Sequence, residues 1–277
     1  MKTILVLTDL GKKAENAALY AFRLAEKAQS NVILYHSFTV FQSVAVPETG
    51  MWPVDDYEQT KNESLTQLQV LANNLRIQSE PGKFIPEIDI LNGTGNLEDT
   101  VQEMLKEKNI DLIVMGAKSA DVLSHLFTGS ETNHMIDEVK CPILFVPEDY
   151  RFHPFKTIVF ATDLKKAYPE AVSFVVDLAL INCSQIIIAH VGEGGNFSPA
   201  GCLKLVKEVY EYPNVSFRQL PDGNTNDQLK SFITYAGADL TVMVHHKHSL
   251  IGELIPGSNS KKMLYKHKNP VLVLPDI

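Results

Sequence analysis

The sequence predicts an α/β protein made of two tandem, doubly wound domains, each a five-stranded and mostly parallel sheet with helices on both faces. Three observations lead to this prediction: the chain repeats itself, its apolar runs are short and continuous, and helical patterns separate those runs. A length of 277 residues also suits two domains better than one.

The repeat is visible as pairs of similar segments. In order along the chain, the matching segments are 2–10 with 156–164, 111–115 with 239–243, and 142–147 with 270–275. The later pairs match at a shorter offset than the first pair, so the first half has a longer segment between its second and third strands. We predict domains at residues 1–148 and 154–277, joined by a short, polar connector bounded by prolines.

The elements follow one order in each half. Apolar runs of four to seven residues, rich in Ile, Val and Leu, are typical of strands covered on both faces of a parallel sheet. Apolar residues at steps of three and four predict helices over residues 14–28, 65–75 and 97–105 of the first half. The order is therefore βαβαβαβ, then a helix and a last strand. An open sheet of this kind binds ligands beyond the carboxyl ends of its strands.

Composition disfavours several classes of protein. With 45% hydrophobic and 21% charged residues, the chain is typical of a globular protein rather than a disordered one. A formal net charge of −8 opposes non-specific binding to nucleic acid or to an anionic membrane. No apolar run is long enough for a membrane span or a signal peptide, and Cys141, Cys183 and Cys202 lack a CxxC spacing. We expect a cytoplasmic protein.

The most informative stretch follows the predicted fourth strand of the first half. Gly116 lies at the strand exit, Ser119 follows, and Gly129 and Ser130 stand where a helix is predicted to begin. Free N–H groups at a helix start attract anions, and glycine allows a phosphate to approach without a Cβ in the way. From the residues alone, an ordinary strand end and an ordinary helix start explain the pattern as well.

These residues resemble the universal stress protein family, in a tandem arrangement that covers essentially the whole chain. The family's nucleotide motif is Gly, two residues, Gly, nine residues, then Gly and Ser or Thr. Gly116, Gly129 and Ser130 match it, whereas Ser119 stands at the second glycine position. The resemblance implies a Rossmann-like fold of the adenine nucleotide alpha hydrolase type, a role in stress response, and ATP or another adenine nucleotide as ligand, with Mg²⁺ as its companion ion.

The resemblance also implies which residues form the site. Base and ribose would meet the ends of the first, second and fourth strands, and the phosphates would meet the segment after the fourth. The implied residues are Leu7, Thr8, Asp9, Ser37, Met115 and Gly116 for base and ribose, and Lys118, Ser119, Gly129, Ser130 and Glu131 for the phosphates. Asp9 would accept a hydrogen bond from the base or ribose, although capping of the next helix explains this aspartate equally well.

The second half has lost more of the motif. It keeps Gly257 and Ser258, but Val244 and Lys247 stand at the two earlier glycine positions. Because the Val244 side chain obstructs the approach that glycine permits, we expect that this half does not bind ATP in the family manner. Asp163 persists after the first strand of this half and, like Asp9, could cap a helix.

Several histidines and glycines have structural explanations. His245, His246 and His248 could form a metal site, but no Cys or carboxylate flanks them at a ligand-like step, so a solvated loop or polar contacts across a pseudo-dimer are favoured. His36 and His190 end apolar runs, as structural histidines do. Residues 93–95, Gly-Thr-Gly, predict a loop before a helix cap rather than a dinucleotide site.

No P-loop, nucleophile elbow or HExxH pattern is present, so we predict that the protein is not an enzyme. The leading hypothesis is a stress-response module that binds ATP or AMP in its first half. One alternative is a nucleotide-independent scaffold that contacts an unknown protein partner through residues 40–53, which contain the only Trp. Another is a very slow ATPase in which Asp9 or Glu131 orients water.

The last strands of the two halves, residues 143–146 and 271–274, are strongly apolar and would lie at sheet edges, which must be paired or covered. The family resemblance implies that such strands pair across a dimer. In a tandem chain this pairing can be internal, which predicts an intramolecular pseudo-dimer and leaves homodimerisation open.

Overall fold

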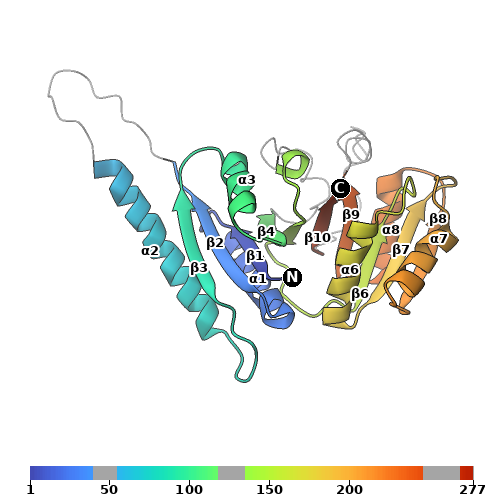
Figure 1. Cartoon of the computed structure of the whole chain (residues 1–277), viewed down its shortest axis with the longest axis horizontal. Helices are drawn as coiled ribbons and strands as arrows, with labels where there is room; N and C mark the ends of the chain where they lie inside the picture. Colours follow the sequence, from blue (N-terminus) through green and yellow to red (C-terminus); the bar gives the residue numbers. More distant parts are fainter. Residues whose placement is uncertain (40–54, 118–134, 246–268, 277) are drawn as a thin grey trace, which may run out of the picture. The chain divides into compact units, whose positions relative to one another are not determined.

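The computed structural model describes residues 1–39, 55–117, 135–245 and 269–276. The chain divides into two compact units, Met1–Gly116 and Ala117–Ile277. Both units are sheets of mostly parallel strands joined by helices (Figure 1). The predicted α/β fold class is confirmed.

The first unit is an all-parallel sheet with strand order β3-β2-β1-β4. Its elements are β1 (Thr3–Leu7), α1 (Lys12–Ala28), β2 (Asn31–Ser37), α2 (Asp55–Ile77), β3 (Ile88–Gly93), α3 (Leu97–Glu107) and β4 (Leu112–Ala117). The helices α1 and α2 contact each other on one face. Because α3 runs back from β3 to β4, a right-handed crossover places it on the other face.

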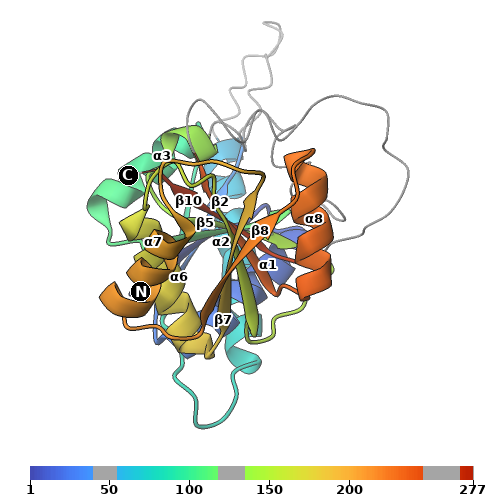
Figure 2. The same cartoon turned by 90° about the vertical axis from the view of Figure 1, so that its right-hand side faces the viewer.

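The second unit has strand order β5-β10-β9-β6-β7-β8. Its elements are β5 (Ile143–Pro147), β6 (Thr157–Ala161), α6 (Pro169–Asn182), β7 (Gln185–Val191), α7 (Pro199–Lys204), a π-helical turn η1 (Leu205–Val209), β8 (Val215–Leu220), α8 (Thr225–Ala236), β9 (Leu240–His245) and β10 (Val271–Pro275). The helices α6 and α7 cover one face of this sheet and α8 covers the other (Figure 2).

The last strands of the two repeats pair with each other, as the sequence predicts. β5 runs antiparallel to β10, with Leu144 opposite Leu272. Since β5 belongs to the first repeat by sequence and to the second unit by its contacts, the compact units differ from the repeat boundaries predicted at residues 148 and 154. Within the second unit, β10 lies between β5 and β9, so this apolar strand has no open edge.

The repeat extends to individual hydrogen bonds. In each repeat an aspartate just before the fourth strand accepts bonds, through Oδ2, from two main-chain N–H groups where the first strand begins. The bonds are Asp111 with Lys2 (2.5 Å) and Thr3 (3.0 Å), and Asp239 with Lys156 (2.6 Å) and Thr157 (2.9 Å). The carboxylates therefore tie the first and fourth strands together in both copies.

The helices form as their patterns predict. The face of α1 that packs on the sheet is rich in alanine, including Ala17, Ala18 and Ala21, so the helix approaches the strands closely. The loop after β3 leads to Asn96, whose side chain accepts bonds from the N–H groups of Glu98 and Asp99 and caps α3.

Among the described residues, no helix is both long and apolar enough to cross a membrane. All three cysteines are free thiols.

Candidate functional site

The described part of the predicted nucleotide site lies at the carboxyl ends of β1, β2 and β4. Leu7 ends β1 and lies opposite Met115 of β4, and Ser37 ends β2. Because these strands are neighbours and parallel, the structure brings the predicted base and ribose residues of the first repeat to one sheet edge. The predicted phosphate residues, Lys118, Ser119, Gly129, Ser130 and Glu131, lie outside the described residues.

A tight turn after β1 positions Asp9. Oγ1 of Thr8 accepts a bond from the Leu10 N–H (3.0 Å), and Oδ1 of Asp9 accepts one from the Gly11 N–H (2.9 Å). Leu10 is left-handed, with φ of 60°, and Gly11 is the N-cap residue of α1. Asp9 therefore holds the turn that leads into α1 rather than capping the helix, and it remains exposed.

The second repeat forms the same turn. Oγ1 of Thr162 accepts a bond from the Leu164 N–H (3.1 Å), and Oδ1 of Asp163 accepts one from the Lys165 N–H (3.0 Å). Leu164 is also left-handed, with φ of 55°. The matching Thr-Asp-Leu segments thus adopt the same backbone conformation in both repeats.

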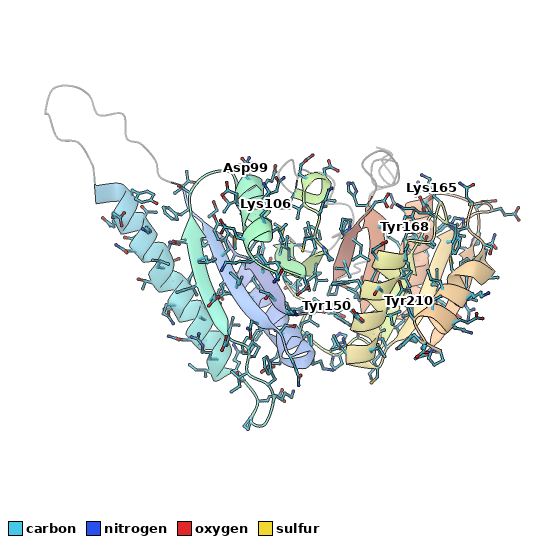
Figure 3. All side chains as sticks on the ribbon, in the orientation of Figure 1. Asp99, Lys106, Tyr150, Lys165, Tyr168 and Tyr210 are labelled. Atoms are coloured by element: carbon cyan, nitrogen blue, oxygen red, sulfur yellow. The ribbon has the colours of Figure 1, made fainter. Side chains whose placement is uncertain are left out.

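The surroundings of Asp163 differ from those of Asp9. The Tyr168 hydroxyl donates to Oδ1 of Asp163 (2.7 Å), and Nζ of Lys165 lies 3.5 Å from Oδ2. Figure 3 labels the side chains of Tyr168 and Lys165. The Asp163 side chain is only 7% exposed. Burial raises the pKa of Tyr168, and the hydrogen bond and charge of Asp163 raise it further. The carboxylate of the second repeat is therefore occupied by the chain's own side chains.

A loop after β7 covers the same turn. Gly195 has φ of 111°, and a Cβ at this glycine would lie only 2.5 Å from Cβ of Leu164. The Phe197 N–H donates to the Leu164 carbonyl (2.9 Å), which fixes the loop in place. The strand tip of the second repeat is thus packed by residues of its own unit.

Gly116 of the first repeat faces α1. A Cβ at Gly116 would lie 3.0 Å from the Lys13 carbonyl oxygen and 3.3 Å from the Ala14 nitrogen. Its absence lets the first turn of α1 lie against the end of β4. Helix packing, which the sequence did not predict, therefore accounts for this glycine without a ligand.

Both repeated histidines have hydrogen-bond partners, but the partners differ. Nδ1 of His36 lies 2.9 Å from Oγ of Ser64 in α2, whereas Nδ1 of His190 lies 2.9 Å from the Thr162 carbonyl oxygen. Burial lowers the pKa of His36, and the negative charge of Asp9 opposes that shift. His36 therefore stays mostly neutral near pH 7, next to the exposed carboxylate of the candidate site.

Comparison with known proteins identifies the family. The sequence model described as the universal stress protein family matches residues 1–147, more than half of the chain. The chain belongs to the universal stress protein family. The universal stress protein Slr1230 of Synechocystis sp. is 25% identical over 294 residues, which cover 98% of this chain and 99% of that protein.

Two further proteins are similar to this chain, one in sequence and one in fold. A universal stress protein of Thermus aquaticus is 26% identical over 147 residues, which cover 52% of this chain and 98% of that protein. The crystal structure of a universal stress protein from Archaeoglobus fulgidus superposes with a TM-score of 0.71 at 16% identity, covering 99% of this chain and 98% of that one. Full-length similarity to Slr1230 is consistent with the tandem form of the family.

In this tandem universal stress protein, one of the three clustered histidines bridges the two repeats. Nε2 of His245, at the end of β9, lies 2.5 Å from Oδ1 of Asp137, which belongs to the first repeat by sequence. The predicted polar contact across the pseudo-dimer is therefore confirmed for His245, while His246 and His248 lie outside the described residues. Within the described part of the chain, no group of three or more His, Cys, Asp or Glu residues could hold a metal ion.

Sequence reasoning missed Tyr35. This residue of β2 lies directly opposite Leu7, and Leu7 lies opposite Met115, so the three form one row across β2, β1 and β4. The apolar runs predict three strands but carry no information on their register. Only strand pairing therefore reveals that Tyr35 lies beside Leu7 and in one row with Met115, two predicted site residues of the universal stress protein.

Replacing Gly116 with alanine separates its two interpretations. If the glycine serves packing, we expect a loss of about 1 kcal/mol in the free energy of unfolding, because the nearest atoms belong to the Lys13 main chain and cannot rotate away. Nucleotide affinity would stay unchanged. Urea unfolding and calorimetric titration with ATP measure the two effects. A drop in affinity at unchanged stability would instead assign Gly116 to the ligand.

Proposed function

We propose that this universal stress protein is a non-enzymatic stress-response module whose first repeat binds ATP or another adenine nucleotide and whose second repeat does not. One observation carries the proposal. The same Thr-Asp-Leu turn presents an exposed carboxylate in the first repeat and a covered one in the second, where Tyr168 and Lys165 engage Asp163. A ligand can reach Asp9 without displacing such partners.

The side chains at this edge suit an adenosine group. Leu7 and Met115 are apolar neighbours on adjacent strands, and the partly exposed Met115 can contact a flat ring. Oδ1 of Asp9 holds the turn, and no described residue bonds to Oδ2, which can accept a hydrogen bond from the base or the ribose. Ser37 offers a hydroxyl at the end of β2. The predicted phosphate contacts, Lys118, Ser119, Gly129, Ser130 and Glu131, complete the proposed site.

Nucleotide occupancy would act as a signal rather than as fuel. A ligand shifts a protein toward whichever conformation binds it better, and no bond needs to be cleaved for that effect. Mg²⁺ would enter with the phosphates, since this ion is commonly held through substrate phosphates. We therefore expect neither ADP nor inorganic phosphate to accumulate when the protein is incubated for a long time with ATP and Mg²⁺. Steady, Mg²⁺-dependent turnover would establish the slow ATPase instead.

Replacing Asp9 with alanine tests the proposed site. We expect the affinity for ATP, ADP and AMP to fall about 10-fold or more, because a hydrogen bond to a charged group contributes about 1.5–3 kcal/mol. The matched variant Asp163→Ala should keep wild-type affinity and unfold at a lower temperature, because Tyr168 and the Lys165 N–H lose an acceptor. Calorimetric titration and thermal unfolding of both variants give the answer. An equal loss of affinity in Asp9→Ala and Asp163→Ala would contradict the proposal that only the first repeat binds the nucleotide.

A ligand-independent scaffold is the second candidate. The packing of Gly116 against α1 favours it, because the glycine of the motif is then explained without a phosphate. In that case no adenine nucleotide binds the wild-type chain, and a partner protein is retained in pull-down by the wild type but not by a variant lacking residues 40–53.

We also propose a cytoplasmic location and an internal pseudo-dimer that can associate with a second chain. Analytical sedimentation measures this self-association.

A further inference from the structure

Among the described residues, Tyr35 has the position that best suits contact with a bound ligand. It lies between Leu7 on β1 and Leu91 on β3, and Met115 lies beyond Leu7. Paired residues of neighbouring parallel strands point to the same face of a sheet. The Tyr35 ring therefore belongs to the apolar row that the proposed function assigns to the base.

The hydroxyl of Tyr35 is buried and lacks a partner. The residue is 3% exposed, and no described residue forms a hydrogen bond with its hydroxyl oxygen. A buried polar group that makes no hydrogen bond destabilises the folded protein, and phenylalanine would fill the same space without that cost. Packing within the first unit therefore does not explain why position 35 is tyrosine rather than phenylalanine.

Gly93 leaves room for this hydroxyl at the carboxyl end of β3. A Cβ at Gly93 would lie 3.0 Å from the Tyr35 hydroxyl oxygen. Gly93 does not have a positive φ, so backbone conformation does not require glycine here. The glycine is partly exposed and is followed by the exposed residues Thr94 and Gly95. The hydroxyl thus lies beside a partly exposed glycine, at the carboxyl ends of the strands where the ligand is proposed to bind.

We propose that the Tyr35 hydroxyl forms a hydrogen bond with the adenosine part of the bound nucleotide and so contributes to ligand selection. This inference rests on the proposed function. Met115, the partly exposed member of this row, contacts the flat base, and the Tyr35 hydroxyl supplies a polar group that both donates and accepts. The ligand reaches the hydroxyl beside Gly93, where there is no side chain, and the bond that the free protein lacks forms on binding.

The test is Tyr35→Phe in the full chain, titrated by calorimetry with ATP, ADP, AMP and adenosine. We expect affinity to fall about 3- to 10-fold, which corresponds to the net value of one hydrogen bond. The factor should be the same for all four ligands, because the contact is to the group that they share. The unfolding temperature of the ligand-free variant should equal or exceed that of the wild type, since an unpaired buried hydroxyl is removed.

Tyr212→Phe is the matched control. Its hydroxyl is also buried but donates to the Ser184 carbonyl in the second unit. We expect this variant to unfold at a lower temperature and to keep wild-type affinity, the opposite of Tyr35→Phe. Unchanged affinity of Tyr35→Phe, alongside a wild type that binds, overturns the inference and leaves the proposed function intact. A clear loss of ligand-free stability in Tyr35→Phe also overturns it. If the wild type binds none of the four ligands, the proposed function itself fails.

Discussion

Replacing Arg23 with methionine is expected to lower the free energy of unfolding of the first unit by about 3 kcal/mol, because it leaves a buried carboxylate without its counter-charge. Nη1 of Arg23 lies 2.8 Å from Oε2 of Glu26, whose side chain is only 2% exposed. The other oxygen of Glu26 is buried and has no hydrogen-bond partner among the described residues. Nη2 of Arg23 also donates to the Gln78 carbonyl (2.7 Å), which ties the end of α2 to α1.

Urea unfolding followed by circular dichroism measures the effect of Arg23→Met. The double variant Arg23→Met/Glu26→Met removes both charges, so we expect it to recover much of the lost stability. Lys83→Ala is the surface control: Lys83 pairs with Glu80, and both side chains are about half exposed, at 46% and 55%. Its unfolding midpoint should stay at the wild-type value. An Arg23 variant as stable as this control would show that Glu26 is hydrated in solution.

Gly195→Ala has the second largest expected effect, a loss of about 3 kcal/mol in the stability of the second unit. Two costs combine: a side chain at φ of 111° is strained, and the new Cβ would lie 2.5 Å from Cβ of Leu164. The loop after β7 would have to move off the Leu164 turn. Hydrogen exchange should then accelerate at the Phe197 N–H, which donates to the Leu164 carbonyl.

Gly194→Ala is the matched control for Gly195→Ala. Gly194 has nearly the same φ, 115°, but a Cβ there would meet no atom within 4 Å. It should therefore show the backbone strain alone, about 1–2 kcal/mol. The difference between the two variants measures the contact with Leu164. Equal losses would mean that the loop does not pack on the turn as described.

Hydrophobic pattern and local motifs were sufficient to predict most of the fold. The matching Lys-Thr-Ile segments at residues 2 and 156 revealed the repeat, and the apolar runs after them predicted parallel strands joined by helices. The strongly apolar last strands needed to be paired or covered, and the family resemblance implied the pairing that β5 and β10 make. These features depend on near neighbours in the sequence and on the need to bury apolar surface.

The candidate site could be located from the sequence only in part. The first-repeat residues Leu7, Asp9, Ser37 and Met115 do meet at one sheet edge, because parallel strands end together. Tyr35 was missed because its place beside Leu7 depends on strand register. The packing of Gly116 on α1 was not foreseen either, because a distance between a strand end and a helix start is not encoded in either segment alone.

Asp9 and Asp163 show most clearly what the sequence by itself could and could not determine. Their Thr-Asp-Leu segments are identical in sequence and in hydrogen bonding, so local sequence determined the turn in both repeats. Only the tertiary structure decided that one carboxylate is open and the other covered, because Tyr168 and the loop through Gly195 fold back over the second turn. A turn follows from hydrogen bonds between adjacent residues, whereas access to it depends on which distant residues pack above it.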